Sequence, residues 1–393
     1  MEKVVIPFAA VAVVLLLLPP PFISSTITVP GDNCTRICGN ISIPYPFGIE
    51  PGCYHAGGFN LTCLKLNQTV HGHARHRLFL GDGTVQVLGI SIPANTVRIS
   101  SHRVMLKNYG GYTINGTWGT GLPEGGPYAL AESVNSVAVV GCNVQVDFRG
   151  GVNNGLLGSC SAVCPYINTP DGPAQITRIG HKCTGVGCCQ ANNILEYSFY
   201  HIEIHVPGMN NTADATDSIA VYLADGSVDY TDNMTLYSFP RALPATLGWV
   251  ISNSTCPAHG VAPECRSAKS YCQNATVGRN GYMCYCASGY QGNPYVAAGC
   301  KDINECSSPE IYPCYGQCEN TAGSYICRDC PNGNYGNSFA NGGCHSVKDS
   351  HIGTKSLCAA FTCFQTFMAL SDYKSYDQAT KKKSIVSIAI TPS

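Results

Sequence analysis

Oxygen donors beside closely spaced cysteines are the residues of this sequence best suited to chemistry. Asp302 and Glu305 come just before Cys306, and Asn320 follows Cys318. Carboxylate, amide and backbone carbonyl oxygens are the ligands of Ca²⁺, which takes about six to eight of them. Disulfides would hold these oxygens together in a segment too short to bury a hydrophobic core of its own. The spacing therefore predicts a calcium site.

A run of cations forms a second candidate site. Between residues 65 and 107 there are six Lys and Arg residues and a single acid, Asp82, which makes a local net charge of +5. The candidate binding residues of the run, which spans residues 65–107, are Lys65, His71, His73, Arg75, Arg77, Arg98, Arg103 and Lys107. Residues 71, 73, 75 and 77 alternate, so they would share one face of a β-strand. Such a row could bind the repeated carboxylates of an acidic polymer, with protonated histidines adding charge at mildly acidic pH.

Two other interpretations of this basic run stay open. It could be a solvated loop that binds no ligand. His71, His73 and His76 could instead bind zinc, which is less favoured because no cysteine or carboxylate is spaced to complete the site.

Composition places the chain in an oxidising compartment. Its 393 residues include 24 cysteines, more than a cytosolic protein normally carries. A formal net charge of −1 excludes a strongly basic nucleic-acid-binding protein. Abundant glycine, proline and tyrosine favour turns and short strands over long helices, so we expect an all-β, disulfide-rich, multidomain fold.

The N-terminus has the layout of a secretory signal peptide. A short polar start precedes an apolar run from Val4 to Leu18, and the small residues Ser24 and Ser25 follow. The alternative is an uncleaved signal that tethers the chain to a membrane. Nine Asn-x-Ser/Thr sequons agree with secretion and predict glycosylation at Asn33, Asn40, Asn60, Asn67, Asn115, Asn210, Asn233, Asn253 and Asn274.

Strand-like runs fill the first half of the chain. Val85–Ile92, Thr96–Ile99 and Val137–Val140 predict strands, and the alternation over Leu195–Val206 predicts another. Ten cysteines lie in residues 31–189, none in residues 190–255 and twelve in residues 256–344. The chain therefore divides into segments of different cysteine content.

The last cysteine-rich segment resembles a calcium-binding epidermal-growth-factor-like (EGF-like) module. Asp302-Ile303-Asn304-Glu305-Cys306 matches the opening of that module, and Asn320 followed by the aromatic Tyr325 matches its later part. The resemblance implies Ca²⁺ as cofactor, with ligands from Asp302, Ile303, Glu305, Asn320, Thr321 and Ser324. It also implies the disulfides Cys306–Cys318, Cys314–Cys327 and Cys330–Cys344. Two residues separate Cys327 from Cys330, where the family usually has one.

Upstream, the chain resembles the extracellular part of plant wall-associated receptor kinases. The cysteines of a first EGF-like module are Cys256, Cys265, Cys272, Cys284, Cys286 and Cys300. Residues 34–40 and 43–49, with the later Cys188-Cys189 pair, are similar to the galacturonan-binding domain of that family.

The resemblance implies an order of domains along the chain. We expect a signal peptide (1–25), a galacturonan-binding-like domain (26–189), a Cys-free β region (190–255), two EGF-like modules (256–300 and 301–344) and an atypical tail without expected order (345–393). We recognise no transmembrane span or kinase motif after residue 344, which is the pattern of a soluble or truncated receptor form.

The expected function is non-catalytic binding of pectin or oligogalacturonides outside the cell or in its wall, with calcium stiffening the EGF-like pair. The alternative is a protein-interaction module in which that pair recognises an extracellular peptide or receptor partner. Cys327 and Cys330 fit a structural disulfide set better than a redox site, and no catalytic motif supports an enzyme.

Overall fold

The computed structural model describes most of the chain between residues 33 and 346. The described ranges are 33–70, 73–108, 113–122, 125–132, 134–151, 153–176, 183, 185–192, 197–206, 219–226, 240–258, 260–275, 280–331 and 333–346. The predicted signal peptide and nearly all of the tail lie outside them. Contacts divide the chain into two compact units, Met1–Ile303 and Asn304–Ser393.

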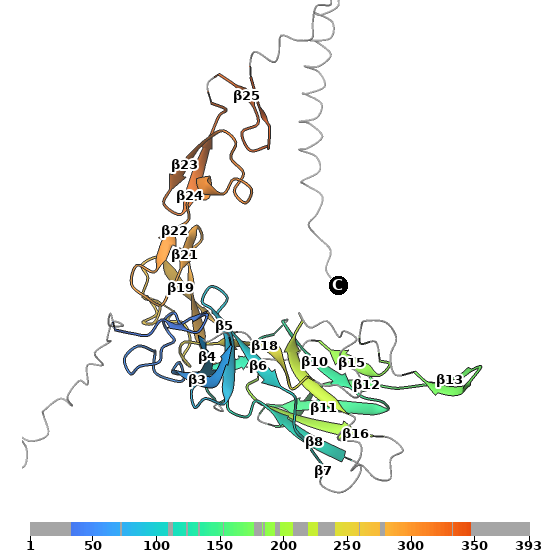
Figure 1. Cartoon of the computed structure of the whole chain (residues 1–393). Coiled ribbons are helices and arrows are strands. Elements are labelled where there is room, and N and C mark those ends of the chain that lie inside the picture. Colours follow the sequence, from blue (N-terminus) through green and yellow to red (C-terminus); the bar gives the residue numbers. More distant parts are fainter. Residues whose placement is uncertain are drawn as a thin grey trace, which may run out of the picture. The chain divides into compact units, whose positions relative to one another are not determined.

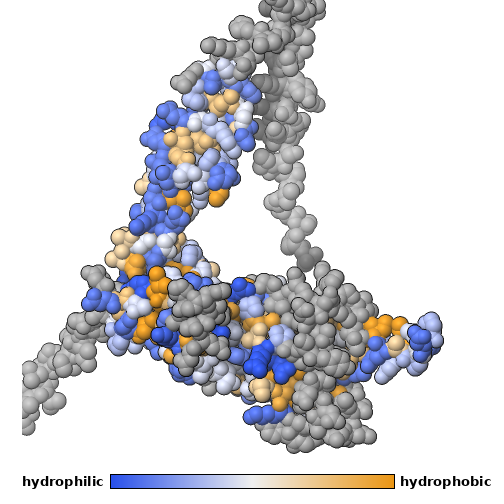
Figure 2. Space-filling model, viewed as in Figure 1, coloured by the Kyte–Doolittle hydropathy of each residue, from blue (hydrophilic) through white to orange (hydrophobic). Residues whose placement is uncertain are grey.

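The elements of the described residues are β-strands and one short 3-10 helix, η3 (Glu305–Ser307), which confirms the expected all-β, disulfide-rich class. Within these ranges no helix is long and apolar enough to cross a membrane. In the view of Figure 2, hydrophilic and hydrophobic residues are interspersed over the coloured surface of each unit.

The largest sheet of the first unit has six strands in the order β3-β4-β5-β6-β18-β9 (Figure 1). Their bounds are Leu61–Val70 (β3), His73–Leu80 (β4), Val85–Ser91 (β5), Thr96–His102 (β6), Ala242–Trp249 (β18) and Tyr128–Leu130 (β9). Strands β5 and β6 confirm two of the predicted runs. All neighbours are antiparallel, and β18 joins β6 to β9 although it comes much later in the sequence.

A second, five-stranded sheet has the order β12-β11-β16-β8-β7. Its strands are Gly155–Ala162 (β12), Val144–Gly150 (β11), Tyr200–His205 (β16), Thr113–Trp118 (β8) and Leu106–Asn108 (β7). On β16 the side chains of Tyr200, Ile202 and Ile204 are buried. The residues between them, His201, Glu203 and His205, are polar and less buried, because alternate residues of a strand face opposite sides of the sheet. One face of this sheet is therefore polar.

A third sheet has the order β15-β10-β17, formed by Cys188–Ala191 (β15), Asn135–Val140 (β10) and Ala220–Asp225 (β17). Strands β10 and β17 are buried at every position, and β10 contains the predicted strand at residues 137–140. The Cys-free segment 190–255 forms no separate sheet in the described residues. Its strands β16, β17 and β18 each pair with strands that precede residue 190.

Short two-stranded ribbons complete the first unit. They are β1 (Ile37–Cys38) with β2 (Ile41–Ser42), β13 (Tyr166–Thr169) with β14 (Gly172–Gln175), β19 (Ser270–Asn274) with β20 (Tyr282–Cys286), and β21 (Tyr290–Gly292) with β22 (Cys300–Asp302). The pairing of the earlier cysteines, which the sequence left open, is Cys34–Cys53, Cys38–Cys63, Cys142–Cys164, Cys160–Cys189 and Cys183–Cys188.

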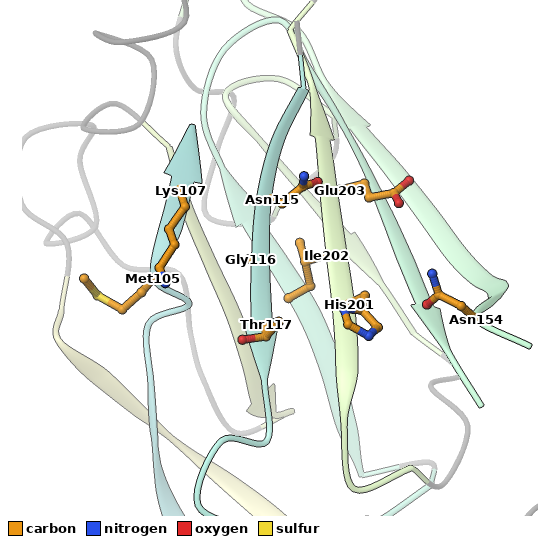
Figure 3. A pocket seen from close by; sticks show the side chains of 9 residues that line it. All are labelled: Met105, Lys107, Asn115, Gly116, Thr117, Asn154, His201, Ile202 and Glu203. Carbon is orange, nitrogen blue, oxygen red and sulfur yellow. The ribbon is translucent and has the colours of Figure 1, made fainter. Parts of the chain in front are cut away.

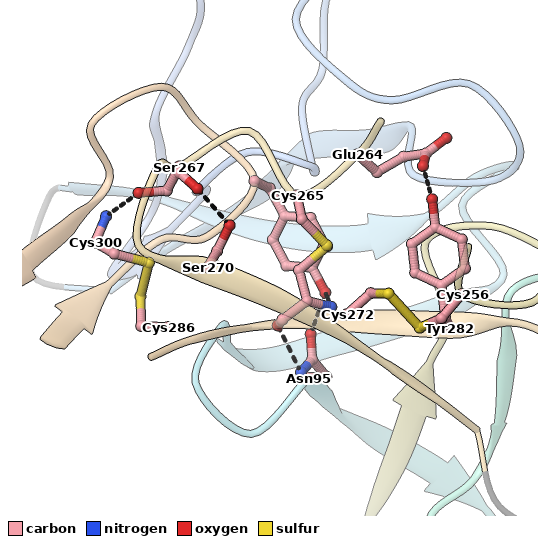
Figure 4. Close-up of a disulfide and its surroundings, with 12 residues drawn as sticks. Asn95, Cys256, Glu264, Cys265, Ser267, Ser270, Cys272, Tyr282, Cys286 and Cys300 are labelled. Carbon is pink, nitrogen blue, oxygen red and sulfur yellow. Dashed lines mark hydrogen bonds between the residues drawn. A yellow bond between two sulfur atoms is a disulfide. The ribbon is translucent and has the colours of Figure 1, made fainter. Parts of the chain in front are cut away.

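The first EGF-like module packs into the core of the first unit. Its disulfides are Cys256–Cys272, Cys265–Cys284 and Cys286–Cys300. The buried ring of Tyr295 lies 5.1 Å from that of Trp249 in β18, measured between centroids. The Tyr295 hydroxyl donates to Oδ1 of Asn95 and accepts from the backbone N–H of Cys284 at 2.9 Å. Figure 4 shows Asn95 beside the disulfides of this module.

The second unit contains the segment predicted to be the second EGF-like module. A hairpin of β23 (Gln317–Thr321) and β24 (Ser324–Arg328) is followed by the short pair β25 (Tyr335–Gly336) and β26 (Cys344–His345). Its disulfides are the three that the resemblance implies. Because this module has few buried side chains, its disulfides contribute most of its stability.

Candidate functional site

A groove of about 480 Å³ in the first unit is the main candidate site, called here the basic groove. It is lined by the start of β5, the end of β6, the segment that leads into β7, and the end of β8 with the turn after it. Its ionisable lining residues are His102, Arg103 and Lys107, and none of its described lining residues is Asp or Glu. Ser100, Ser101, Thr117 and Thr120 add hydroxyl groups. Such a lining suits an anionic, hydroxyl-rich ligand.

Arg241 adds a further cation that the sequence analysis did not identify. The backbone N–H of Arg103 donates to the carbonyl oxygen of Arg241 at 2.9 Å. The next residue, Ala242, pairs with His102, because β18 runs antiparallel to β6. Arg241 is exposed, and its backbone lies beside that of Arg103, which lines the groove. Only the pairing of β18 with β6 reveals this neighbour.

Tyr222 in β17 helps to place this segment. Its hydroxyl donates to the carbonyl oxygen of Pro240 at 2.7 Å, directly before Arg241. Burial raises the pKa of Tyr222 to about 12, and the charge of Arg103 opposes part of that rise. The phenol therefore stays protonated, and keeps its role as a donor, at any physiological pH.

A second depression, of about 370 Å³, adjoins the basic groove on the polar face of the five-stranded sheet (Figure 3). The two share Met105, Lys107 and Thr117 as lining residues. Asn115 pairs with Lys107 on one side and with Glu203 on the other. Because Asn115 is also a predicted glycosylation site, a glycan there would begin inside this second depression.

The remaining residues of the predicted basic row do not gather at the groove. Lys65 pairs with His76 and Leu64 with Arg77, so Lys65 and Arg77 project from opposite faces of β3 and β4. His71 and the side chains of His73 and Arg75 fall outside the described part of the chain. The single row and the zinc alternative therefore stay predictions.

Arg98 contacts a carboxylate of the chain itself. Its Nε donates to Oδ2 of Asp225 at 2.7 Å and its Nη2 to Oδ1 at 3.3 Å. Asp225 lies at the end of β17 and is 5% exposed. The guanidinium of Arg98 thus compensates a buried charge, which favours a structural role for this residue over ligand binding.

The predicted glycosylation sites differ in exposure. Asn33, Asn40, Asn253 and Asn274 are exposed, whereas Asn60 and Asn115 are partly buried. The side chain of Asn67, and Asn210 and Asn233 altogether, lie outside the described residues.

In the second unit, the predicted calcium ligand Glu305 lies in η3. Its side chain is 3% exposed, and its Oε2 is buried without a hydrogen-bond partner. In the β23–β24 hairpin, Asn320 pairs with Tyr325 and Thr321 with Ser324. Asp302 and Ile303 belong to the first unit, so the described geometry of this site is that of the residues from Glu305 onward. A buried carboxylate oxygen without a partner fits a group whose ligand is a cation.

Comparison with known proteins supports the resemblance. Residues 34–101 match the family described as wall-associated receptor kinase galacturonan-binding. The chain is 33% identical over 314 residues to wall-associated receptor kinase 2 of Arabidopsis thaliana, a match that covers 77% of this chain and 39% of that protein. Wall-associated receptor kinase 5 is 32% identical over 317 residues and wall-associated receptor kinase 1 is 28% identical over 315, each with 39% of its length covered. No solved structure matches the chain.

The matched domain and the basic groove overlap along the chain. The groove takes Thr84, Val85, Ile99, Ser100 and Ser101 from the matched residues and the rest of its lining from residues 102–122. The chain spans well under half the length of the curated relatives that it matches. Over 77% of its length the chain is similar to wall-associated receptor kinase 2, and its residues 34–101 match the galacturonan-binding family of these kinases.

Proposed function

We propose that the chain binds acidic cell-wall polysaccharide of the galacturonan class, outside the cell and without catalysing a reaction, and that the basic groove takes the sugar chain. The observation that carries the proposal is the placement of Arg103 and Lys107 in one groove without an acidic residue in its described lining, partly within the matched domain, with the backbone of Arg241 bonded to that of Arg103. Galacturonan has a carboxylate on each sugar, and arginine binds carboxylates through two parallel hydrogen bonds.

The lining of the groove suits a sugar acid in a second way. Ser100 and Thr117 offer hydroxyl groups that can donate to or accept from sugar hydroxyls, whereas the buried Ser101 hydroxyl accepts from Nε1 of Trp118. Neutral or methyl-esterified pectin would keep these contacts but lose the charged ones. Recognition should therefore depend on free carboxylates.

The experiment is binding of defined oligogalacturonides to the purified glycosylated chain by calorimetry at two salt concentrations. Lys107→Gln and Arg241→Gln should each weaken binding by on the order of 1 kcal/mol, or about fivefold in Kd, since each removes one exposed positive charge. Raising the salt concentration should weaken wild-type binding, because exposed charges are screened.

The matched control is Lys301→Gln, which removes an exposed lysine from β22, outside the groove lining. It should leave the affinity unchanged. Methyl-esterified oligomers serve as the neutral ligand. Equal losses in Lys301→Gln and Lys107→Gln would show unspecific charge attraction and reject the groove as the site.

We propose separately that Ca²⁺ binds to the second unit through the side chains of Glu305 and Asn320 and the backbone carbonyls of Thr321 and Ser324. The buried, unpaired Oε2 of Glu305 supports this assignment. Calcium would neutralise that carboxylate and stiffen the EGF-like pair.

Calcium titration tests this second proposal. A wild-type Kd of roughly 0.1–1 mM is expected, as in other extracellular modules. Glu305→Gln should weaken binding strongly, whereas Glu310→Gln, which changes an exposed acid of the same module, should not. Identical titrations for the two variants would remove Glu305 from the ligand set.

Recognition of an extracellular protein partner by the EGF-like pair is the alternative function. Large exposed hydrophobic side chains of the second unit favour it, with Ile311 67%, Phe339 55% and Tyr335 52% exposed. A chain that binds no oligogalacturonide at any salt concentration would direct attention to this surface.

A further inference from the structure

Two carboxylates face each other across strands β11 and β16 of the five-stranded sheet. Asp147 pairs directly with Glu203, and the next pair on the same face places Gln145 opposite His205. Like charges directly opposite each other on a sheet repel, so such a pair is stable only when cations lie close by. The array is on the polar face of the sheet, next to the depression shown in Figure 3, where Glu203 and His201 project from β16.

One resident cation is already in contact with this pair. Arg149 Nε donates to Glu203 Oε2 at 2.8 Å, and an Arg149 Nη2 lies 4.0 Å from Asp147 Oδ2. One guanidinium against two carboxylates leaves a net charge of −1 while the imidazole of His205 is neutral. A further cation is therefore favoured electrostatically at this position.

His205 lies close enough to Asp147 for both side chains to ligate one cation. Its Nε2 is 3.8 Å from Asp147 Oδ2, too far for a hydrogen bond but close to the separation of two atoms that ligate one small metal ion. One ligand atom each from Asp147, Glu203 and His205 can be chosen so that all lie within 4.8 Å of one another. Small rotations of the side chains would bring them to a common centre.

The surroundings hold the ligand atoms in orientation. Gln145 Nε2 donates to Asp147 Oδ1 at 3.3 Å, which turns Oδ2 toward His205. Arg149 holds one oxygen of Glu203, and the carboxylate has a second oxygen to offer a metal. Hydrogen bonds from neighbouring side chains to ligating carboxylates are a usual part of protein metal sites. Asp147 is 9% exposed and His205 remains partly open to solvent, so an ion has a path of entry.

We propose that Asp147, Glu203 and His205 form a binding site for a divalent transition-metal ion of the zinc class. One imidazole nitrogen and two carboxylate oxygens are a donor set that favours zinc over calcium or magnesium, which prefer oxygen alone. Water would complete the coordination. The site is distinct from the calcium ligands of the second unit and from the zinc alternative at His71, His73 and His76.

The test is equilibrium binding of Zn²⁺ to the intact, chelator-treated chain, with Co²⁺ absorption as a second readout of coordination by nitrogen and oxygen. Every cysteine in the described residues is disulfide-bonded, and Cys358 and Cys363, which lie outside them, are alkylated beforehand. One equivalent of metal should bind, and His205→Gln should weaken it by at least about tenfold, the loss caused elsewhere by removing even a supporting residue.

The matched control is His201→Gln, on the same strand and the same face as His205. It should bind zinc like wild type, and Glu203→Gln should behave like His205→Gln. Thermal melting in chelator verifies that each variant is folded. The proposal is overturned if wild type binds no zinc, if His201→Gln and His205→Gln lose equal affinity, or if binding disappears only when His71, His73 and His76 are all replaced by Gln.

Discussion

Replacing Tyr295 by Phe tests how the first EGF-like module is joined to the sheets. The substitution conserves the buried ring and removes only the hydroxyl, which donates to Asn95 and accepts from the N–H of Cys284. Both partners are buried, Asn95 at 1% exposure and Cys284 at 0%. Each would lose a hydrogen bond in a place that water does not reach.

The expected cost follows from those two groups. A buried polar group left without a partner costs about 1–3 kcal/mol, so Tyr295→Phe should lower the free energy of unfolding by about 2–4 kcal/mol. Burial raises the pKa of Tyr295, so the hydroxyl is neutral and able to donate throughout the range used for such measurements.

Denaturant unfolding of the intact chain under non-reducing conditions is the assay. Fluorescence reports on the site, because the chain has two tryptophans and Trp249 contacts Tyr295. Tyr271→Phe is the control, since Tyr271 is 50% exposed and its loss should cost less than about 0.5 kcal/mol. If Tyr295→Phe is no more destabilising than Tyr271→Phe, the buried hydrogen bonds do not join the module to the sheet.

Three further changes have defined outcomes. Arg98→Gln should lower the free energy of unfolding by about 1–3 kcal/mol, less than for a fully buried ion pair because Arg98 is partly exposed. It should leave oligogalacturonide affinity unchanged. A loss of affinity without a loss of stability would contradict the structural role inferred from its contact with Asp225. Burial lowers the pKa of His55, so the unfolded chain binds more protons than the folded one and stability should fall as pH drops below about 6.5. His55→Phe should therefore reduce the difference in unfolding free energy between pH 7 and pH 5. An unchanged difference would mean that other groups cause the pH dependence. Joint replacement of Cys38 and Cys63 by Ala, which opens a loop of sequence separation 25, should cost about 2–4 kcal/mol in the same unfolding assay, and an unchanged midpoint would mean that this disulfide does not limit stability.

Local patterns in the sequence predicted what depends on neighbours along the chain. Alternation and β-branched residues identified β5, β6 and β10, because the period of two is a property of the strand itself. The longer prediction at Leu195–Val206 was only partly met, with β16 described from Tyr200 to His205. The resemblance to an EGF-like module implied the three disulfides of the second unit, and the structure has the same pairs.

The candidate sites depended instead on strand order. Sequence distance grouped eight basic residues between Lys65 and Lys107, but the structure turns Lys65 and Arg77 to opposite faces and pairs Arg98 with Asp225. The groove keeps Arg103 and Lys107 and lies beside Arg241, because β18 pairs with β6.

The sequence by itself determined the all-β class, the oxidised cysteine framework and the resemblance to the wall-associated receptor kinases, all of which rest on composition, period and spacing. Tertiary structure alone decided which cations share a groove, that the first EGF-like module packs against Trp249, and that Asp147, Glu203 and His205 meet. The physical reason is that pairing between distant strands is selected by burial of both faces and by register over the whole sheet, and a shift of one residue would turn every one of these side chains to the other face.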